Sequence, residues 1–539
     1  MNYGNDLYGI WTNTLKYDNT FGKHKLAILA GSEAVQYSGS SLYGTRSEFF
    51  STDINYLLLQ NGSTQNNNSS SAYISTLFSL FGRLDYSYDD KYLMGITARR
   101  DGSSVFGAEK RYGVFPSISL GWRISNEPFM KNNITWINDL KIRASYGELG
   151  NQSNVNGSNA FTLFGSAVGS SYYDIGATNN SSQQGFYQTQ IGNAYTSWEK
   201  DIVTNFGIDA AILNNKVDFS VEYYKKAIKG LLFPEPLPAT IGQAAAPSIN
   251  IGDIQNTGVD ISANYRDKLG QDLSFTIGAN ITSYNNKVMS IPGSAGYFDT
   301  GDNGRTGTVC RNQQGYPVSS FFGYEVIGLF QSDDDVAKSP IQQDAGPGQF
   351  KYRDVNKDGE ITPDDRTFIG NPNPKFTYGI NLGLNYKNFD LSAVFFGSQG
   401  NKVYNQTKWY TYFTSYYRDG LNNNVLNAWT PENTNTTVPA LIGNSSFSEN
   451  GVPNSWYIED GSFLKCRSLT LGYTLPSGTI KKLKINKLRV YVQVVNLFQI
   501  TKYSGLDPEI QGSASAFGID FGNYPNRQKQ FFAGVNVSF

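Results

Sequence analysis

The stretch Lys375–Tyr386, KFTYGINLGLNY, alternates strictly between apolar residues and residues that are polar or small. Its apolar face carries Phe376, Tyr378, Ile380, Leu382, Leu384 and Tyr386. Its other face carries Thr377, Gly379, Asn381, Gly383 and Asn385. Because successive side chains of a β-strand point to opposite faces of the sheet, this stretch predicts a strand with one apolar and one polar face.

The same alternation recurs along the chain, for example in Val114–Ser125 (VFPSISLGWRIS) and in Phe531–Phe539 (FFAGVNVSF). We count about fifteen such strands of about ten residues each, the first over about Leu7–Tyr17. That length is long for a strand of a soluble sandwich, but it matches a tilted crossing of a bilayer core. Aromatic residues such as Trp122 gather near the ends of the apolar faces, where a membrane protein carries its interfacial girdle.

The connections between these strands alternate between short turns and long loops. The long loops, rich in Gly, Asn and Ser, follow the even strands and span Gly39–Ser71, Gly150–Asp201, Lys229–Asp253, Lys287–Pro374 and Gly400–Ser462. Outer-membrane barrels have short periplasmic turns and long outer loops. The sequence therefore predicts an all-β fold, an antiparallel transmembrane β-barrel whose last strand ends in the periplasm with Phe539. The alternative is a secreted β protein.

Composition excludes several classes of function. The chain has 539 residues with a formal net charge of −1, which is no nucleic-acid-binding signature. Its mean hydropathy is −0.39, and no apolar run approaches the roughly 18 residues of a spanning helix. We find no nucleophile–base–acid set, phosphate loop or zinc spacing, so we expect no enzyme activity.

Several long stretches carry a resemblance to one family. They are Phe115–Met130 (FPSISLGWRISNEPFM), Leu140–Gln152 (LKIRASYGELGNQ), Ile369–Asn401, Tyr457–Pro476 (YIEDGSFLKCRSLTLGYTLP) and Leu488–Glu509 (LRVYVQVVNLFQITKYSGLDPE). Together they resemble the barrel of SusC/RagA-type TonB-dependent transporters of Bacteroidota, and the resemblance runs over nearly the whole chain.

The resemblance implies a 22-stranded barrel in the cell outer membrane with an N-terminal plug. It implies uptake of oligosaccharides, glycans or peptides, energised through TonB, together with a SusD-like surface lipoprotein. Residues 1–539 then form the C-terminal part of such a barrel, about 15 strands, with the N-terminal strands and the plug missing. The alternatives are a passive porin or adhesin-like barrel and a secreted calcium-binding β protein.

The beginning of the chain fits that expectation. The segment Met1–Thr20 (MNYGNDLYGIWTNTLKYDNT) has neither the basic nor the apolar region of a signal peptide. We therefore expect the chain to be the C-terminal part of a longer protein. An odd strand count leaves the first strand without a neighbour, so we expect either an open arc or a strained closure.

The long loop 287–374 contains a calcium-type motif at Asp354–Asp365 (DVNKDGEITPDD). Its candidate metal ligands are Asp354, Asn356, Asp358, Glu360, Thr362 and Asp365. Gly359 occupies the sixth position, where the chain turns sharply, and Asp365 replaces the usual Glu at the twelfth, which favours weaker binding. We predict a structural calcium ion that holds this loop, and the alternative is an ion-free Asx turn.

Charged residues at strand positions opposite the apolar faces are assigned to the barrel interior, which is wet. They are Arg83, Asp85, Arg99, Arg123, Lys141 and Arg143. We expect them to pair with one another and with plug carboxylates; the alternative is that they contact the plug or passing substrate.

Two further predictions concern the outer face and the loops. Lys465 and Arg467 are assigned to the outward face, where they contact lipid phosphates or snorkel. Aromatic loop segments at Tyr187–Trp198 and Thr407–Tyr417 either stack on sugar rings or pack the loops, against one another or against a lipoprotein.

Overall fold

The computed structural model describes residues 2–539 except 175, 177–181, 235, 236, 238, 292–295, 416–419, 481–483 and 523–527. The chain divides into two compact units. Unit 1 comprises Met1–Pro128, Lys141–Phe206 and Lys226–Asp253, and unit 2 comprises Phe129–Leu140, Gly207–Lys225 and Ile254–Phe539.

The dominant element is an antiparallel sheet of fifteen strands, which we call the wall. Its strands, in order, are β1 (Asn2–Phe21), β2 (His24–Phe49), β3 (Gly62–Tyr88), β4 (Tyr92–Ser103), β5 (Tyr112–Arg123), β6 (Ile137–Asn151), β11 (Glu199–Ile212), β12 (Val217–Lys229), β15 (Asp253–Leu269), β16 (Leu273–Ser290), β23 (Phe376–Tyr386), β24 (Phe389–Gln399), β27 (Phe463–Thr474), β28 (Lys487–Thr501) and β30 (Gln530–Ser538). The predicted all-β antiparallel fold and strand number are therefore confirmed.

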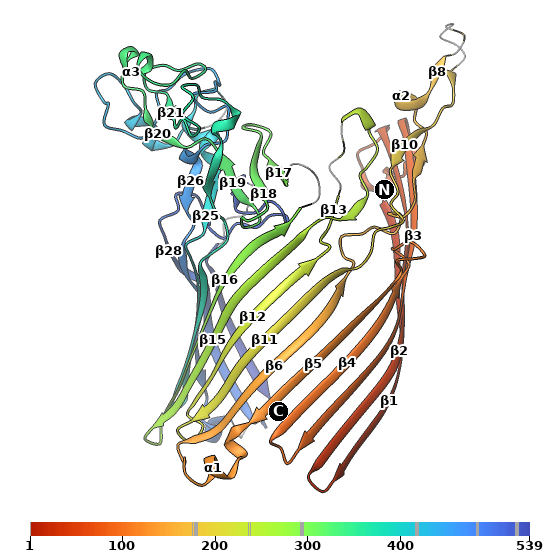
Figure 1. Cartoon of the computed structure of the whole chain (residues 1–539), viewed down its shortest axis with the longest axis vertical. Helices are drawn as coiled ribbons and strands as arrows, with labels where there is room; N and C mark the ends of the chain where they lie inside the picture. The colour runs from red at the N-terminus through yellow and green to blue at the C-terminus, as the bar shows by residue number, and fades with distance from the viewer. Residues whose placement is uncertain are drawn as a thin grey trace. The chain divides into compact units, whose positions relative to one another are not determined.

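Short turns join the wall strands at one end (Figure 1). Gly22 has a φ of 61°, and Asp89 and Asp90 have values of 53° and 52°, so these turns use the left-handed region in which Gly, Asn and Asp are favoured. Lys387, between β23 and β24, also lies there with a φ of 52°. The tight turns were predicted correctly from their polar and glycine-rich sequences.

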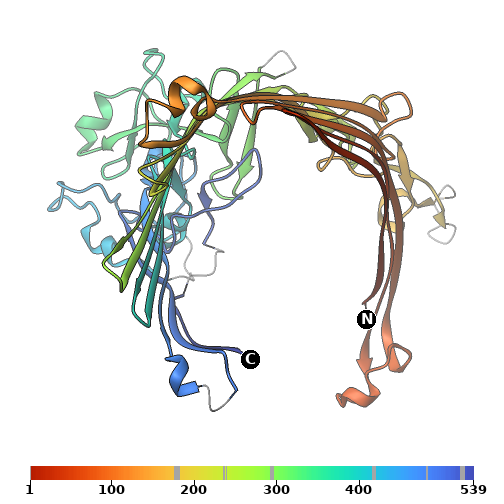
Figure 2. The ribbon, with the colours of Figure 1, turned by 90° about the horizontal axis from the view of Figure 1, so that it is seen from below.

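Within unit 1, β1 to β5 pair as consecutive antiparallel neighbours in one layer (Figure 2). Strand β1 pairs with β2 from Asn2↔Tyr43 to Phe21↔His24. Strands β2 and β3 pair up to Phe49↔Gly62. The predicted loop Gly39–Ser71 is therefore wrong: most of it is strand, and the connection is only the short segment 50–61.

Within unit 2, β16, β23, β24, β27, β28 and β30 form a continuous antiparallel series. Strand β23 covers nearly all of the stretch that opened the sequence analysis. Its register brings Leu382 opposite Ile277 of β16 and Ala393 of β24. The register shifts between Val394 and Phe395, and again between Cys466 and Ser468.

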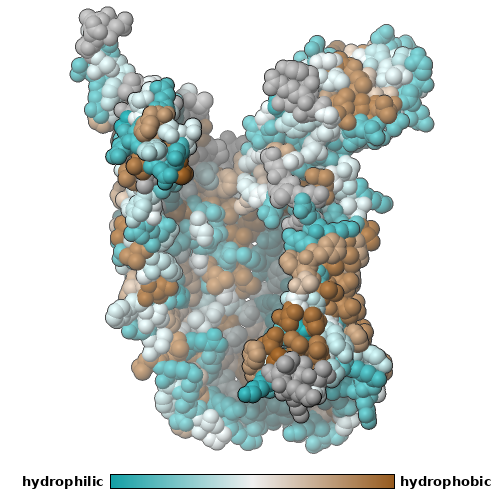
Figure 3. Space-filling view, turned by 180° about the vertical axis from the view of Figure 1, so that it is seen from behind, coloured by the Kyte–Doolittle hydropathy of each residue, from teal (hydrophilic) through white to brown (hydrophobic). Residues whose placement is uncertain are grey.

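In the described part of the chain, no second layer covers the apolar face of the wall. Leu15 is 77% exposed, Leu382 40% and Val492 54%, although all three are large aliphatic residues in regular strands. Apolar residues gather over the strands of unit 2 on the right of Figure 3. Such an exposed apolar face is what a lipid-facing strand requires. Among the described residues, no helix is long and apolar enough to cross a membrane.

The long loops of unit 2 fold into small sheets and short helices. These are β17 (Tyr297–Asp302), β18 (Thr308–Gln313), β19 (Ser320–Gly323), β20 (Val326–Leu329), β21 (Phe350–Tyr352), β22 (Thr367–Gly370), β25 (Lys402–Asn405), β26 (Ile458–Asp460), β29 (Ile519–Asp520), α3 (Asp333–Ala337) and α4 (Thr407–Tyr412).

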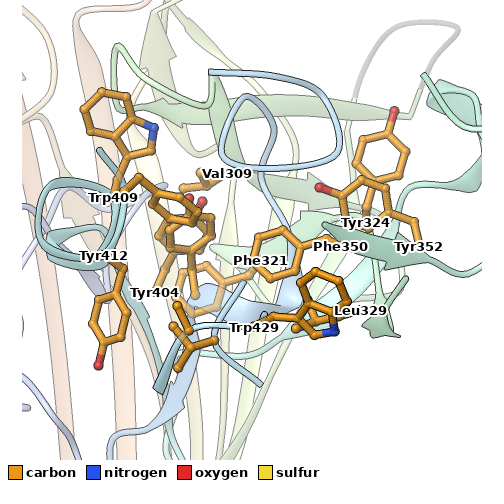
Figure 4. Close-up of a cluster of buried hydrophobic side chains, with 14 of the residues drawn as sticks. Val309, Phe321, Tyr324, Leu329, Phe350, Tyr352, Tyr404, Trp409, Tyr412 and Trp429 are labelled. Atoms are coloured by element: carbon orange, nitrogen blue, oxygen red, sulfur yellow. The ribbon is translucent and has the colours of Figure 1, made fainter. Parts of the chain in front are cut away.

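These loop elements enclose an aromatic cluster, which we call the loop core (Figure 4). It contains Val309, Cys310, Phe321, Tyr324, Leu329, Phe350, Tyr352, Ile361, Tyr404, Trp409, Tyr412, Phe413, Val425, Ala428, Trp429, Val438, Tyr457 and Ile519. Tyr404 stacks on Tyr457 with ring centroids 5.2 Å apart, and Tyr324 stacks on Tyr352 at 5.1 Å. Since Tyr404 and Tyr457 are fully buried, the loops form a packed subdomain with its own core.

Unit 1 has smaller loop elements around a second cluster. They are α2 (Val168–Ser171), β7 (Leu163–Gly165), β8 (Tyr173–Asp174), β9 (Ser182–Gln183), β10 (Tyr187–Gln190), β13 (Leu232–Pro234) and β14 (Ser248–Asn250). The cluster consists of Val105, Phe106, Phe115, Val155, Trp198 and Leu232.

Candidate functional site

The polar face of the wall in unit 1 brings the predicted interior residues together. The strand pairing places Asp85 opposite Gly95 and Gly95 opposite Ser119, while Arg123 lies opposite Lys141 and Arg143 opposite Gly121. Because opposite residues share a face, all six candidates project from the same side of the sheet. Asp85, Lys141 and Arg143 line a pocket of about 810 Å³ there.

Several of these charged side chains form ion pairs, with one another or with neighbouring carboxylates. Arg83 forms an ion pair with Asp85 at 2.6 Å, and Arg99 pairs with Glu33 at 2.9 Å and with Asp101 at 2.7 Å. Arg143 donates to the Asn205 side-chain oxygen at 3.2 Å. This arrangement agrees with the expectation that the charges pair among themselves; a contact with plug or substrate stays a prediction.

The predicted calcium loop is tightly organised by its own hydrogen bonds. The Asp354 carboxylate accepts the backbone N–H groups of Lys357 at 2.6 Å and Gly359 at 2.9 Å. Asn356 accepts from the Asp358 N–H at 3.0 Å, and Asp358 accepts from the Glu360 N–H at 2.9 Å. Gly359 has a φ of 89°, which explains why the sixth position needs glycine.

The end of the motif is a short helical turn, η5 (Pro363–Asp365), with Thr362 as its N-cap. The side chain of Asp365 closes the capping box by accepting from the Thr362 N–H at 2.8 Å, and it also accepts from Val355. Asp365 is completely buried. Thr362 and Pro363 thus occupy the N-cap and the first helical position, where Thr and Pro are favoured.

These contacts bear on whether the loop fits a calcium ion. The Asn356 amide donates to Asp358 at 2.8 Å, and no group of three or more His, Cys, Asp or Glu among the described residues is arranged to hold a metal. The hydrogen bonds are those of the Asx turns that the alternative predicted. Part of the predicted ligand set is of another kind, since Asn, Thr and backbone oxygens can also bind calcium.

Lys465 does not face lipid, contrary to the prediction. It is 2% exposed, and its ammonium lies 2.7 Å from Asp507 and 2.9 Å from Glu509. Arg467 also pairs with Glu509. The register shift between Cys466 and Ser468 interrupts the alternation, so the face assigned to Leu469 and Leu471 does not extend to Lys465.

The aromatic loop segments mainly pack the loops. Trp198 lies 4.9 Å from Phe106 and 5.4 Å from Phe115 between ring centroids, and Trp409, Tyr412 and Phe413 belong to the loop core. Tyr195 is the exception, at 75% exposure. Tyr416 and Tyr417 lie outside the described residues.

A buried acid beside the loop core could not be recognised from the sequence pattern. Glu449 stands in the polar segment Gly443–Asn450 (GNSSFSEN), which reads as an exposed loop, yet it is completely buried. Its carboxylate has no hydrogen bond of ordinary geometry. Burial raises the pKa of Glu449 from 4.5 to about 8, and the backbone N–H of Ile442 offsets this only in part.

The sequence of this chain is similar to a family model and to several characterised proteins. Residues 1–497 match the family model described as TonB dependent receptor-like, beta-barrel. The chain is 32% identical to TonB-dependent receptor P3 of Formosa agariphila, over 100% of this chain and 53% of that protein. It is 30% identical to TonB-dependent receptor SusC of Bacteroides thetaiotaomicron, over 86% of this chain and 44% of that protein.

Among solved structures, the chain is similar to one described as the structure of the RagAB peptide transporter. The TM-score is 0.84 with 27% identity, and the match covers 100% of this chain and 56% of that one. The chain thus spans about half the length of the relatives it matches.

Proposed function

This chain belongs to the TonB dependent receptor-like β-barrel family, and from that premise we propose that it supplies the wall and outer loops of an energised importer. The family is one of outer-membrane transport receptors, not enzymes, which agrees with the expected localisation and with the absence of a catalytic motif. The observation that carries the proposal is the single-layered wall, with its exposed apolar face and its charged opposite face.

We propose oligosaccharides, glycans or peptides as the imported substrates, with a SusD-like surface lipoprotein as the outer partner. Similarity to SusC and to the RagAB peptide transporter supports this pairing of substrate class and partner. Membership of the TonB-dependent receptor family supports TonB as the source of energy for uptake. The same family match favours an energised importer over a passive porin, an adhesin or a secreted calcium-binding protein.

The test is uptake by cells in which the gene for this chain has been deleted. We expect the deletion strain to lose uptake of one labelled oligosaccharide or peptide, and a wild-type strain treated with a protonophore to lose it too. Uptake that survives the protonophore would indicate a passive porin. Unchanged uptake of every probe in the deletion strain would contradict the importer.

We also propose that calcium binds the motif Asp354–Asp365 as a structural ion. The spacing of Asp354, Asn356 and Asp358 and the left-handed Gly359 support it, although binding requires the Asn356–Asp358 hydrogen bond to open. Millimolar calcium should raise the thermal midpoint of the loops, and the double variant D354N/D358N should abolish that rise. A calcium-independent midpoint in the unsubstituted protein would leave the ion-free Asx turn as the correct description.

A further inference from the structure

A second pocket, in unit 2, lies where the ends of β16 and β23 meet the loop sheet. Its volume is about 750 Å³, within the range of small-molecule sites. Its sixteen lining residues include Asn286, Tyr316, Phe368, Asn373, Lys375 and Lys402. Two of these residues are lysines and none is acidic, so the lining is positively charged.

One wall of the pocket is an aromatic platform. The rings of Tyr316 and Phe368 stack with their centroids 3.8 Å apart and their planes 19° from parallel. Phe368 is in turn braced edge-on by Phe322 at 5.3 Å. Tyr316 nevertheless remains 42% exposed, so the stack covers one face of its ring and leaves much of the residue open to a ligand.

A second wall consists of fixed amides. Asn373 is 9% exposed, and its side chain donates to the Val318 and Asn371 oxygens, each at 2.9 Å. Asn286 accepts the Val318 N–H at 2.7 Å and so fixes the same segment. In the described part of the chain, the Asn373 side-chain oxygen accepts no hydrogen bond. This oxygen is therefore held in a fixed position and can accept a hydrogen bond from a ligand hydroxyl group.

The two lysines are held in place through their backbones. The Lys375 carbonyl accepts from Ser283 at 2.8 Å, and the Lys402 N–H donates to the Asn371 carbonyl at 2.8 Å. Gly400 has a φ of 83°, and a Cβ there would lie 2.7 Å from Cγ of Lys375. Gly400 therefore leaves room for the stem of Lys375.

Neither lysine forms an ion pair among the described residues. Asp460 lies opposite Lys402 in the β25–β26 pairing, and its pKa is lowered first by the Ser462 hydroxyl and in part by the charge of Lys402. Its carboxylate instead accepts from Ser462, at 2.7 Å from the hydroxyl and 3.1 Å from the N–H. Both ammonium groups can therefore attract an anion that enters the pocket, with Asp460 offsetting part of the Lys402 charge.

We propose that this pocket binds an acidic oligosaccharide, with a sugar ring on Tyr316, hydroxyl groups on Asn373 and a carboxylate or sulfate between Lys375 and Lys402. Flat aromatic rings complement the C–H face of a pyranose, and fixed amides complement its hydroxyl groups. The inference narrows the substrate class of the proposed importer and rests on that function. An acidic peptide offers the same negative charge, but it has no ring to cover Tyr316.

The experiment is calorimetric titration of the detergent-solubilised full chain with four probes. These are tetragalacturonate, its neutral methyl ester, a sulfated tetrasaccharide and hexaglutamate. We expect the neutral ester to bind about tenfold more weakly than tetragalacturonate, because it loses its charged contacts to the lysines. The sulfated probe shows whether the site prefers carboxylate or sulfate; binding of either acidic sugar above the neutral ester supports the proposal.

Three variants locate the effect. K375Q/K402Q should bring tetragalacturonate down to the affinity of its ester, and Y316L should weaken both. K268Q/K387Q removes two lysines outside the pocket lining, one near the end of β15 and one in the turn after β23, and should change neither affinity. Both pocket lysines are exposed, so the variants should fold, and an unchanged thermal midpoint verifies this.

Equal binding of the ester and the acid would overturn the charge assignment. Hexaglutamate binding as tightly as the acidic sugar, with the same loss in Y316L, would overturn the sugar assignment. Absence of binding by every probe would overturn the pocket while leaving importer function to the uptake assay. Specific binding without energised uptake in cells would support the pocket and contradict the proposed importer.

Discussion

The wall and the loop core use the same apolar side chains in opposite ways. In the wall, Leu382 and Val492 are 40% and 54% exposed on a face with no second layer. In the loop core, Phe350 and Tyr404 are fully buried, and short strands and helices surround them. Both regions belong to unit 2.

The contrast shows that solvent, not residue type, decides where apolar side chains go. A lipid tail is as apolar as leucine, so a wall strand loses nothing by leaving its leucines outside. The outer loops meet water and must bury their aromatic residues among themselves, as any soluble domain does. Each region should therefore respond differently to the same substitution.

Truncation in the loop core should have the largest effect. Phe350→Ala removes a completely buried ring and should destabilise the loop subdomain by about 3 to 5 kcal/mol. Leu382→Ala, on the exposed face of β23, should cost less than about 1 kcal/mol, because lipid refills the space. Hydrogen exchange of the loop amides in lipid vesicles measures the first cost, and urea unfolding of the wall measures the second. Similar costs at the two sites would erase the contrast.

Substitution of Lys465 tests whether the upper part of β27 is packed as tightly as the loop core. Lys465→Gln leaves the Asp507 and Glu509 carboxylates without their buried partner and should cost about 3 kcal/mol. Arg83→Gln breaks an ion pair whose side chains are 61% and 44% exposed, so it should cost no more than about 1 kcal/mol. Denaturant unfolding in detergent compares the two variants. If Lys465→Gln were as mild as Arg83→Gln, β27 would be exposed at that point.

An arginine introduced on either face of β23 compares the lipid-facing side and the polar side of one strand. Leu382→Arg puts a guanidinium among lipid tails and should cost about 2 kcal/mol. Asn381→Arg puts the same group on the polar face and should cost little. Urea titration of folding into vesicles gives both values, and equal costs would mean that neither face meets lipid.

The buried acid beside the loop core predicts that the stability of the loops depends on pH. Glu449 keeps its proton up to about pH 8 in the folded state, because burial raises its pKa from 4.5 to about 8. Between those values the folded state binds more protons than the unfolded state, so loop stability falls as pH rises, by about 1 kcal/mol per pH unit. Glu449→Gln should flatten this slope in thermal scans from pH 5 to pH 8. A slope that persists in the variant would assign it to another group.

The wall could be predicted from the sequence because its signal is local. Strand β23, Phe376–Tyr386, coincides with an alternation that anyone can count, and the short turns are marked by their own residues. The ends of β2 and β3 were missed because the segment Gly39–Arg46 (GSSLYGTR) is rich in Ser, Gly and Tyr and has no apolar face. Once a strand extends without such a face, periodicity no longer identifies it.

The candidate site depends on information that the local sequence does not contain. Lys465 was assigned to the wrong face because a register shift between Cys466 and Ser468 interrupts the alternation. No residue type in this segment indicates such a shift. Glu449 is buried where two loops meet, since the Phe350 N–H donates to the neighbouring Ser448 carbonyl. The Tyr316–Phe368 platform joins two positions of one loop that are far apart in sequence. The interior charges were found, because alternation alone assigns a face to each of them.

The loop core is assembled from segments far apart in the chain, and this sets an order of events. Thr300 donates to the Ser515 carbonyl across 215 residues, and the core itself runs from Val309 to Ile519. Contacts of such sequence separation form late, after the intervening chain has been delivered. The outer subdomain should therefore be the last part of this chain to fold during biogenesis. Until Ile519 has been synthesised, the tyrosines and tryptophans of the loop core are exposed and prone to aggregation.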